Sequence, residues 1–259
     1  MTASAIVCRD LRKAFGAFPV LQGISLDVAR GELYGFLGPN GAGKTTTIRI
    51  LTGLLLPSGG TVAVAGYDLE REPLEAKRRV GYVPDRAFLY DKLTGREFLE
   101  FVGHLYGLDP PAVAQASADL LERFDLTAWT GDLIEAYSHG MRQKLALVAA
   151  LLHDPEVLII DEPMVGLDPK SARRVKTLLA ELTARGRTVF LSTHALDVAE
   201  ALCTRVAIIH LGKILAEGTL EDLRRQARHE RGSLEAIFLK LTEEQPADGT
   251  PVAVHEAAS

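Results

Sequence analysis

A glycine-rich segment near residue 40 constrains the fold of this chain more than any other feature. The apolar residues 32–37 before it predict a buried strand, and residues 44–54 after it have the spacing of a helix. Glycines let successive main-chain N–H groups converge on one point, and the start of a helix adds partial positive charge there. A strand, a tight loop and a helix in this order are typical of an α/β protein with a phosphate-binding loop. The segment consists of Gly38, Pro39, Asn40, Gly41, Ala42, Gly43, Lys44, Thr45 and Thr46.

Two side chains at the end of this loop have the chemistry to bind a nucleoside triphosphate. We expect Lys44 to contact the β- and γ-phosphates and the Thr45 hydroxyl to ligate Mg²⁺. The alternative is a chance glycine-rich turn, and average composition produces the core pattern in roughly one chain per hundred of this size. The strand and the helix on either side make chance a poorer explanation. The loop therefore predicts a triphosphate with Mg²⁺, but not what the energy is used for.

A second cluster of charged residues follows the apolar residues 157–160, which predict another buried strand. Asp161 and Glu162 end this strand, and acids in such a place usually face a metal, a base or solvent, because burying them unpaired is costly. Adjacent strand residues point to opposite faces, so we expect two different roles. Asp161 suits Mg²⁺ coordination, and Glu162 suits a catalytic base that polarises the attacking water. The alternative is an acidic loop without chemistry.

The remaining pattern indicates a parallel sheet with helices. Runs that are apolar on both faces suit the interior of a parallel sheet covered by helices. Between residues 86 and 154 helical spacing dominates, so a helical insertion interrupts the α/β core. After residue 218 we expect an amphipathic helix, a further segment at 233–241 and a tail whose composition predicts disorder. The expected strands are 24–28, 32–37, 61–65, 80–83, 157–160, 188–191 and 206–209, and the expected helices include 94–106, 111–124 and 138–152.

Composition narrows the function class. The net charge of −5 argues against a nucleic-acid binder, because phosphate neutralisation needs clustered Lys and Arg. Cys8 and Cys203 lie among apolar neighbours without metal-ligand spacing, as expected of a reduced, cytosolic protein. The first ten residues lack the features of a secretion signal. The longest apolar run, residues 145–152, is far below the roughly 20 residues that span a bilayer, so a membrane role would need a partner.

Three further motifs accompany the loop and the acidic pair in a specific order. Residues 138–144 (Ser-His-Gly-Met-Arg-Gln-Lys) open a helix before the acidic strand, residues 166–169 (Gly-Leu-Asp-Pro) follow that strand, and residues 192–194 (Ser-Thr-His) end the next one. This order resembles the nucleotide-binding cassette of ABC (ATP-binding cassette) transporters. The resemblance implies an α/β fold with a phosphate-loop NTPase core, a mostly parallel sheet, an antiparallel β subdomain and an inserted α-helical subdomain. The implied domains are a cassette at 1–218 with its helical subdomain at about 86–154, a helical extension at 219–242 and a disordered tail at 243–259.

The resemblance also implies roles for individual residues. Phe15 matches the aromatic residue that stacks on adenine. His194 matches the residue that contacts the γ-phosphate and orients Glu162, and Asp168 matches the residue that communicates across the dimer interface. The signature segment would bind the γ-phosphate of ATP held by the other subunit, since Ser138 is a good helix N-cap with free N–H groups behind it. That segment comprises Ser138, His139, Gly140 and Met141.

Two positions depart from the family pattern. The signature usually reads Leu-Ser-Gly-Gly-Gln, whereas residues 137–141 read Tyr-Ser-His-Gly-Met. The family expects Gln after Gly-Tyr-Val-Pro, but residues 81–84 lead into Asp85. Aspartate is a stronger Mg²⁺ ligand than glutamine and donates no amide hydrogen bond, so Asp85 joins Thr45 and Asp161 as an expected metal ligand. We expect hydrolysis to persist with altered coupling, and a degenerate, regulatory cassette is the alternative.

The resemblance implies an ATP-hydrolysing transporter subunit with ATP and Mg²⁺ as cofactors. Its partners would be an integral membrane permease, docked near residues 85–106, and a second cassette in a homodimer or pseudo-symmetric heterodimer. The protein would be cytoplasmic and peripheral on the inner face of the cell membrane, without nucleic acid. The variant motifs and residues 233–241 look most like export-type cassettes with a separate permease chain. The alternatives are a translation factor, which carries two cassettes, and a DNA-repair ATPase, which inserts long coiled coils; neither feature is present in this sequence.

Overall fold

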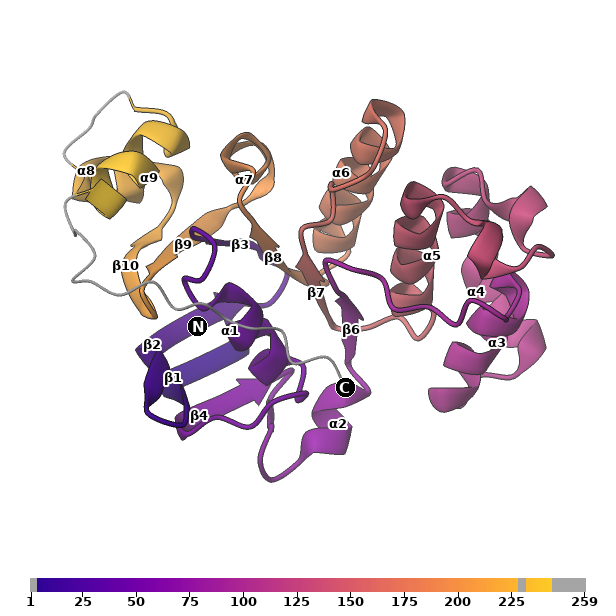
Figure 1. Ribbon diagram of the computed structural model, residues 1–259, viewed down its shortest axis with the longest axis horizontal. Helices are drawn as coiled ribbons and strands as arrows, with labels where there is room; N and C mark the ends of the chain where they lie inside the picture. Colours follow the sequence, from indigo (N-terminus) through magenta and orange to yellow (C-terminus); the bar gives the residue numbers. More distant parts are fainter. Residues whose placement is uncertain (1–3, 228–231, 244–259) are drawn as a thin grey trace.

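The computed structural model describes residues 4–227 and 232–243, and it contains two β-sheets flanked by helices (Figure 1). The larger sheet has the strand order β10-β9-β3-β8-β7-β6. Its neighbouring strands are parallel except for β10, which runs antiparallel to β9. This is the mostly parallel sheet predicted from the sequence. Its strands are β3 (Leu33–Leu37), β6 (Val80–Val83), β7 (Val157–Asp161), β8 (Thr188–Thr193), β9 (Arg205–His210) and β10 (Lys213–Gly218).

The smaller sheet is antiparallel and has the order β2-β1-β4-β5. Its strands are β1 (Ser4–Phe15), β2 (Phe18–Ala29), β4 (Gly59–Val64) and β5 (Tyr67–Asp68). Neither β1 nor the first half of β2 is predicted from the sequence. A break in the β1 register between Cys8 and Leu11, with Asp10 at φ 48°, explains why β1 escapes prediction. Such a bulge interrupts the two-residue alternation on which strand prediction depends.

The helices gather in separate groups around the larger sheet. Helices α3, α4 and α5 stand together at one end of the molecule, whereas α8 and α9 lie at the opposite end beside β10 (Figure 1). The predicted helices are present, but α1 ends at Leu51 rather than residue 54, and Gly53 then takes φ 68°. Their bounds are α1 (Lys44–Leu51), α2 (Pro73–Lys77), α3 (Gly95–Leu105), α4 (Pro110–Arg123), α5 (His139–Leu151), α6 (Pro169–Ala184), α7 (Leu196–Leu202), α8 (Leu220–Gln226) and α9 (Leu234–Glu243), with short 3₁₀ turns at Thr127–Trp129 and Ile134–Ala136.

Strand β7 illustrates how the larger sheet is buried on both faces. Val157 and Ile159 pack in the apolar cluster shared with the smaller sheet. Leu158 and Ile160 pack in the opposite cluster, which contains side chains of α5 and α6. A strand whose residues are buried alternately on both sides reads as a continuous apolar run, as the sequence does at 157–160. Asp161, at the carboxyl end of β7, belongs to neither apolar cluster.

Two predictions concern a membrane span and the C-terminal tail. Within the two described stretches, none of the helices combines the length and apolar character needed to cross a bilayer. The tail predicted from residue 243 onward lies outside the described residues, apart from Glu243 at the end of α9.

Candidate functional site

The loop between β3 and α1 has the backbone conformation that the phosphate-binding pattern requires. Gly41 and Gly43 take φ 78° and 109°, a left-handed conformation that side chains disfavour. A Cβ on Gly43 would also come within 2.7 Å of the Leu21 side chain. Helix α1 receives no side-chain cap and has no acidic residue in its first turn. The N–H groups and positive end of α1 therefore remain available for an anion.

Lys44 lies over this loop with its amine turned toward the backbone. Its side chain is buried, and Nζ donates hydrogen bonds to the carbonyl oxygens of Gly38 (2.6 Å) and Pro39 (3.2 Å). Burial lowers the pKa of the Lys44 amine, and the nearby charges of Glu162 and Asp161 partly oppose that shift. The loop and the acidic pair, far apart in the sequence, are therefore neighbours in space. Of the other loop residues, Asn40, Gly41 and Thr45 are exposed, Pro39 and Thr46 are half-buried, and Gly38, Ala42 and Gly43 are buried.

The two acids after β7 occupy different environments, although not for the reason given by strand alternation. Asp161 is the last residue of the strand and is only 4% exposed, and burial raises the pKa of its carboxyl group. Glu162 lies beyond the strand at φ 51°, a conformation that is costly for a residue other than glycine. Backbone strain of this kind costs about 1–3 kcal/mol and clusters at functional sites. The strained turn, rather than the strand pleat, separates the two carboxylates.

Glu162 is held by the end of the neighbouring strand β8. Its carboxylate accepts hydrogen bonds from Thr193 Oγ1 (3.0 Å) and the His194 main-chain N–H (2.9 Å), and His194 Nδ1 lies 2.7 Å from the same carboxylate. Thr193 Oγ1 in turn accepts a hydrogen bond from Ala195 N (3.0 Å). The His194 side chain is 65% exposed, so its ring faces the open side of the site. Thr193 is a positioning contact that was not among the residues predicted for the site; its place directly before His194 was the available signal.

The expected Mg²⁺ ligands supply oxygen atoms of the right kind. Magnesium is usually held by one or two carboxylates together with substrate phosphates, and it keeps several waters. Asp161 and the exposed Thr45 hydroxyl fit this chemistry. Asp85 is exposed, yet its negative charge contributes to the raised pKa of Asp161, so it is nearby. Across residues 4–227 and 232–243, no three His, Cys, Asp or Glu side chains converge to hold a metal on their own.

The signature segment lies against a different loop. Ser138 caps α5 as predicted, with Oγ accepting from Met141 N (3.3 Å). A Cβ on Gly140 would lie 3.0 Å from the Gly166 carbonyl oxygen, and a Cβ on Gly166 would collide with the His139 ring. Within the described part of the chain, no hydrogen bond or ion pair links residues 138–141 to the phosphate loop.

Asp168 and Phe15 lie at the edges of these segments. Asp168 caps α6 by accepting from the Ser171 N–H (2.9 Å) and Ser171 Oγ (2.5 Å), which lowers the pKa of its carboxyl group to about 2. Phe15 ends β1 at the hairpin and is 49% exposed, with the Lys13 ammonium 5.1 Å from its ring centroid. An exposed aromatic face beside a cation is available for stacking, but its adenine contact stays a prediction.

Comparison with known proteins identifies the family. A family model described as ABC transporter matches residues 21–165. The linearmycin resistance ATP-binding protein LnrL of Bacillus subtilis (strain 168) is 41% identical over 214 residues, which cover 83% of this chain and 69% of LnrL. The daunorubicin resistance ATP-binding protein DrrA3 of Streptomyces coeruleorubidus is 39% identical over 231 residues, covering 89% and 73%. A solved ATP-binding subunit of an ABC transporter superposes with a TM-score of 0.88 at 36% identity, covering 92% of this chain and all of that one.

The matching family model is described as ABC transporter and the similar solved structure as the ATP-binding subunit of one, which disfavours the translation-factor and DNA-repair alternatives. The matched segment contains the phosphate loop, the signature segment and the acidic pair on one continuous stretch. The chain belongs to the ABC transporter family, as an ATP-binding and ATP-hydrolysing cassette.

Proposed function

We propose that this chain is the ATP-hydrolysing subunit of an ABC exporter and works as a dimer of cassettes on a separate integral membrane permease. The observation that carries the proposal is the hydrogen-bonded Glu162 beside Lys44, while Ser138 of the same chain caps α5 and makes no described hydrogen bond to either residue. Export is supported by the resistance functions named for LnrL and DrrA3. The cassette would be cytoplasmic and peripheral on the inner face of the cell membrane through that permease.

In this proposal the chain's own residues bind the triphosphate and handle one proton. The N–H groups of residues 41–46 and the Lys44 amine hold the β- and γ-phosphates, and Phe15 stacks on adenine. Glu162, fixed by Thr193 and His194, accepts the proton of the attacking water. The His194 ring, which is 65% exposed, would contact the γ-phosphate.

Thr45 and Asp161, with Asp85 close by, are the residues that would hold Mg²⁺. The ion would supply positive charge to offset the negative charge on the β- and γ-phosphate oxygens. The raised pKa of Asp161 supports this assignment, because a buried carboxylate without a cation is unfavourable. Asp85 is included because its negative charge acts on the Asp161 carboxyl group.

The second cassette would complete the phosphate cage. Residues 138–141 lie at the capped start of α5, where free N–H groups form a second anion site. Two copies related by a two-fold axis would each place this segment over the nucleotide of the other. A homodimer and a pseudo-symmetric heterodimer both satisfy this arrangement.

The domain organisation follows the same proposal. The cassette would comprise residues 1–218 with a helical subdomain at about 86–154, followed by an extension at 219–242 and a tail at 243–259. Exposed aromatic side chains support permease docking near residues 85–106, because Phe88 is 86% and Tyr90 58% exposed. Large exposed apolar residues in one region are typical of a partner surface.

Dimerisation driven by ATP tests the proposal. The Glu162→Gln variant with saturating MgATP should elute as a dimer in size-exclusion chromatography with light scattering, and as a monomer without nucleotide. The Glu162→Gln/Lys44→Ala double variant is the control and should stay monomeric. Monomers throughout, with or without the cognate permease, would contradict the proposed function.

A further inference from the structure

Gln143 is the most unusual buried polar residue outside the predicted site. Its side chain is 3% exposed, and neither its Oε1 nor its Nε2 has a hydrogen-bond partner in the described structure. A side-chain amide offers two donors and accepts at its oxygen, and nearly all buried polar atoms are hydrogen-bonded. An amide left entirely unpaired is unfavourable, so this conformation of the chain leaves a polar requirement unmet.

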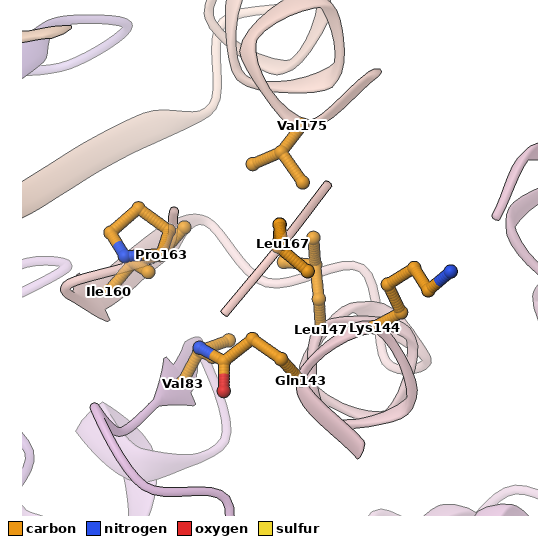
Figure 2. A pocket seen from close by; sticks show the side chains of 8 residues that line it. All are labelled: Val83, Gln143, Lys144, Leu147, Ile160, Pro163, Leu167 and Val175. Carbon is orange, nitrogen blue, oxygen red and sulfur yellow. The ribbon is translucent and has the colours of Figure 1, made fainter. Parts of the chain in front are cut away.

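The side chains around the amide do not provide the missing hydrogen-bond partners. Gln143 extends from α5 toward Val83 into a small cavity whose other side chains, except for Lys144, are apolar (Figure 2). The cavity measures about 10 Å³, which is room for the centre of one water molecule and not for a ligand. A buried water needs two to four polar partners, and such a wall offers it few. The remaining candidates for hydrogen bonds to the amide are main-chain groups of neighbouring segments that change position.

The position of the cavity indicates which groups these are. Its apolar wall includes Val83, Ile160 and Leu167, which directly or closely precede Asp85, Asp161 and Asp168 in the chain. Gln143 itself lies two residues beyond the signature segment, in the same helix α5. One amide therefore stands between the segment predicted to bind the partner's nucleotide and three segments of this chain's own site.

The loop of residues 163–167 offers the most readily available main-chain groups. Pro163 and Leu167 line the cavity from this loop. The loop is held by long main-chain hydrogen bonds, Val165 N to Glu162 O at 3.2 Å and Leu167 N to Met164 O at 3.3 Å. The loop begins directly after Glu162, so a shift of the loop changes the position of the Glu162 carboxylate.

We propose that Gln143 is a positioning residue whose amide forms hydrogen bonds with the main chain of loop 163–167 when ATP closes the cassette dimer, thereby coupling α5 to Glu162. The proposal rests on the proposed function, because it requires an ATP-driven closed dimer. In the single cassette the unpaired amide is unfavourable, and closure of the dimer satisfies it. The resulting energy difference between the two states biases closure toward the arrangement in which Glu162 is correctly placed.

Gln143→Met removes the amide while keeping a side chain of similar length. Without nucleotide the variant should melt about 2–6 °C higher, because an unpaired buried amide is lost. Its kcat for ATP should fall about 10-fold with KM changed less than about 2-fold, in the range usual for coupling between sites. In the Glu162→Gln background, MgATP-driven dimerisation should weaken by a similar factor. Hydrogen–deuterium exchange should show that MgATP protects residues 163–167 in the parent but not in the variant.

Two control variants separate this effect from general repacking. Leu147→Met changes an apolar side chain of the same cavity and should leave dimerisation and loop protection as in the parent. Gln115→Met makes the same chemical change at an exposed position of α4 and should also behave as the parent. Equal loss in Leu147→Met would overturn the proposal, because cavity packing rather than the amide would then be responsible.

The failure of the two proposals can be told apart. If the Glu162→Gln parent remains monomeric with MgATP, the proposed function itself fails. If the parent dimerises and Gln143→Met dimerises equally tightly with the same protection of residues 163–167, the role of Gln143 is refuted. If Gln143→Met does not fold, Gln143→Leu is used in its place. Whatever the variant does, the proposal is overturned if MgATP does not protect residues 163–167 in the parent dimer.

Discussion

Replacing Glu162 by Gln should abolish most ATP hydrolysis while leaving the site assembled. The carboxylate accepts hydrogen bonds from Thr193 Oγ1 and the His194 N–H. A Gln oxygen can still accept from His194 N, and its NH₂ group can donate to Thr193 Oγ1, whose proton is free to rotate away. The change therefore removes a base but few contacts. ATP binding, which depends on the phosphate loop, should be retained.

The expected loss follows from the role of one proton acceptor. General-base catalysis contributes about 10²- to 10⁴-fold, so turnover should fall by that factor, equivalent to about 2.7–5.4 kcal/mol in the activation free energy. Phosphate release under single-turnover conditions measures the chemical step directly, and titration with a fluorescent ATP analogue measures binding. The two measurements separate catalysis from affinity.

Glu156 provides a matched control at the opposite end of β7. It directly precedes β7, whereas Glu162 directly follows it, and it pairs with Arg30 (2.9 Å) and Arg79 (3.2 Å). Glu156→Gln weakens partly exposed ion pairs, each worth at most about 1 kcal/mol, and should hydrolyse ATP at the parent rate. If Glu162→Gln turns over ATP as fast as Glu156→Gln, Glu162 is not the base.

Two further substitutions test the residues proposed to contact the phosphates and to hold Mg²⁺. Lys44→Ala should weaken ATP binding about 10- to 100-fold, the effect of losing charge-assisted hydrogen bonds, and calorimetry showing parental affinity would contradict the loop assignment. Asp161→Asn should eliminate hydrolysis and yet raise the melting temperature of the nucleotide-free protein at pH 7. Burial raises the pKa of Asp161 above 3.8, so its contribution to stability is fully present below that pH and is lost as the pH rises through the folded-state pKa. The gain from Asn should therefore shrink on acidification, and a melting-temperature difference independent of pH between 4 and 8 would refute this reasoning.

The parts of the fold with local signals could be predicted from the sequence. Strands β3 and β7 combine a short apolar run with an abrupt change to glycine or acidic residues, so both strands can be predicted from a few residues. Strand β1 lacks such a signal, because the bulge at Asp10 breaks the alternation and charged residues occupy its exposed side. The predicted helix ran to residue 54 because Leu54 is apolar. In the structure the chain has already left the helix at Gly53, which has a positive φ.

The parts of the site that depend on packing between distant segments could not be predicted. Thr193 reaches Glu162 only because β7 and β8 are neighbours in the sheet. The unpaired state of Gln143 depends on side chains from three other elements. Strand alternation predicted different environments for Asp161 and Glu162, whereas in the structure Glu162 lies beyond the strand at a positive φ. Sequence periodicity contains no information on such a turn.

The separation of the two half-sites has a consequence for energy coupling. Lys44, Asp161 and Glu162 lie together in one chain, so under the proposed function each cassette has its own set of groups for hydrolysis. If the signature segment of the other cassette completes the cage, hydrolysis becomes conditional on closure, and a single cassette retains bound ATP without using it. ATP can drive closure only to the extent that it binds the closed dimer more tightly than the open one. A group that is unsatisfied in the single cassette and satisfied on closure, as proposed for the Gln143 amide, increases that difference without touching the nucleotide. The residue that makes transport efficient need not therefore be one that contacts ATP, and Gln143 is the first place in this chain to test that principle.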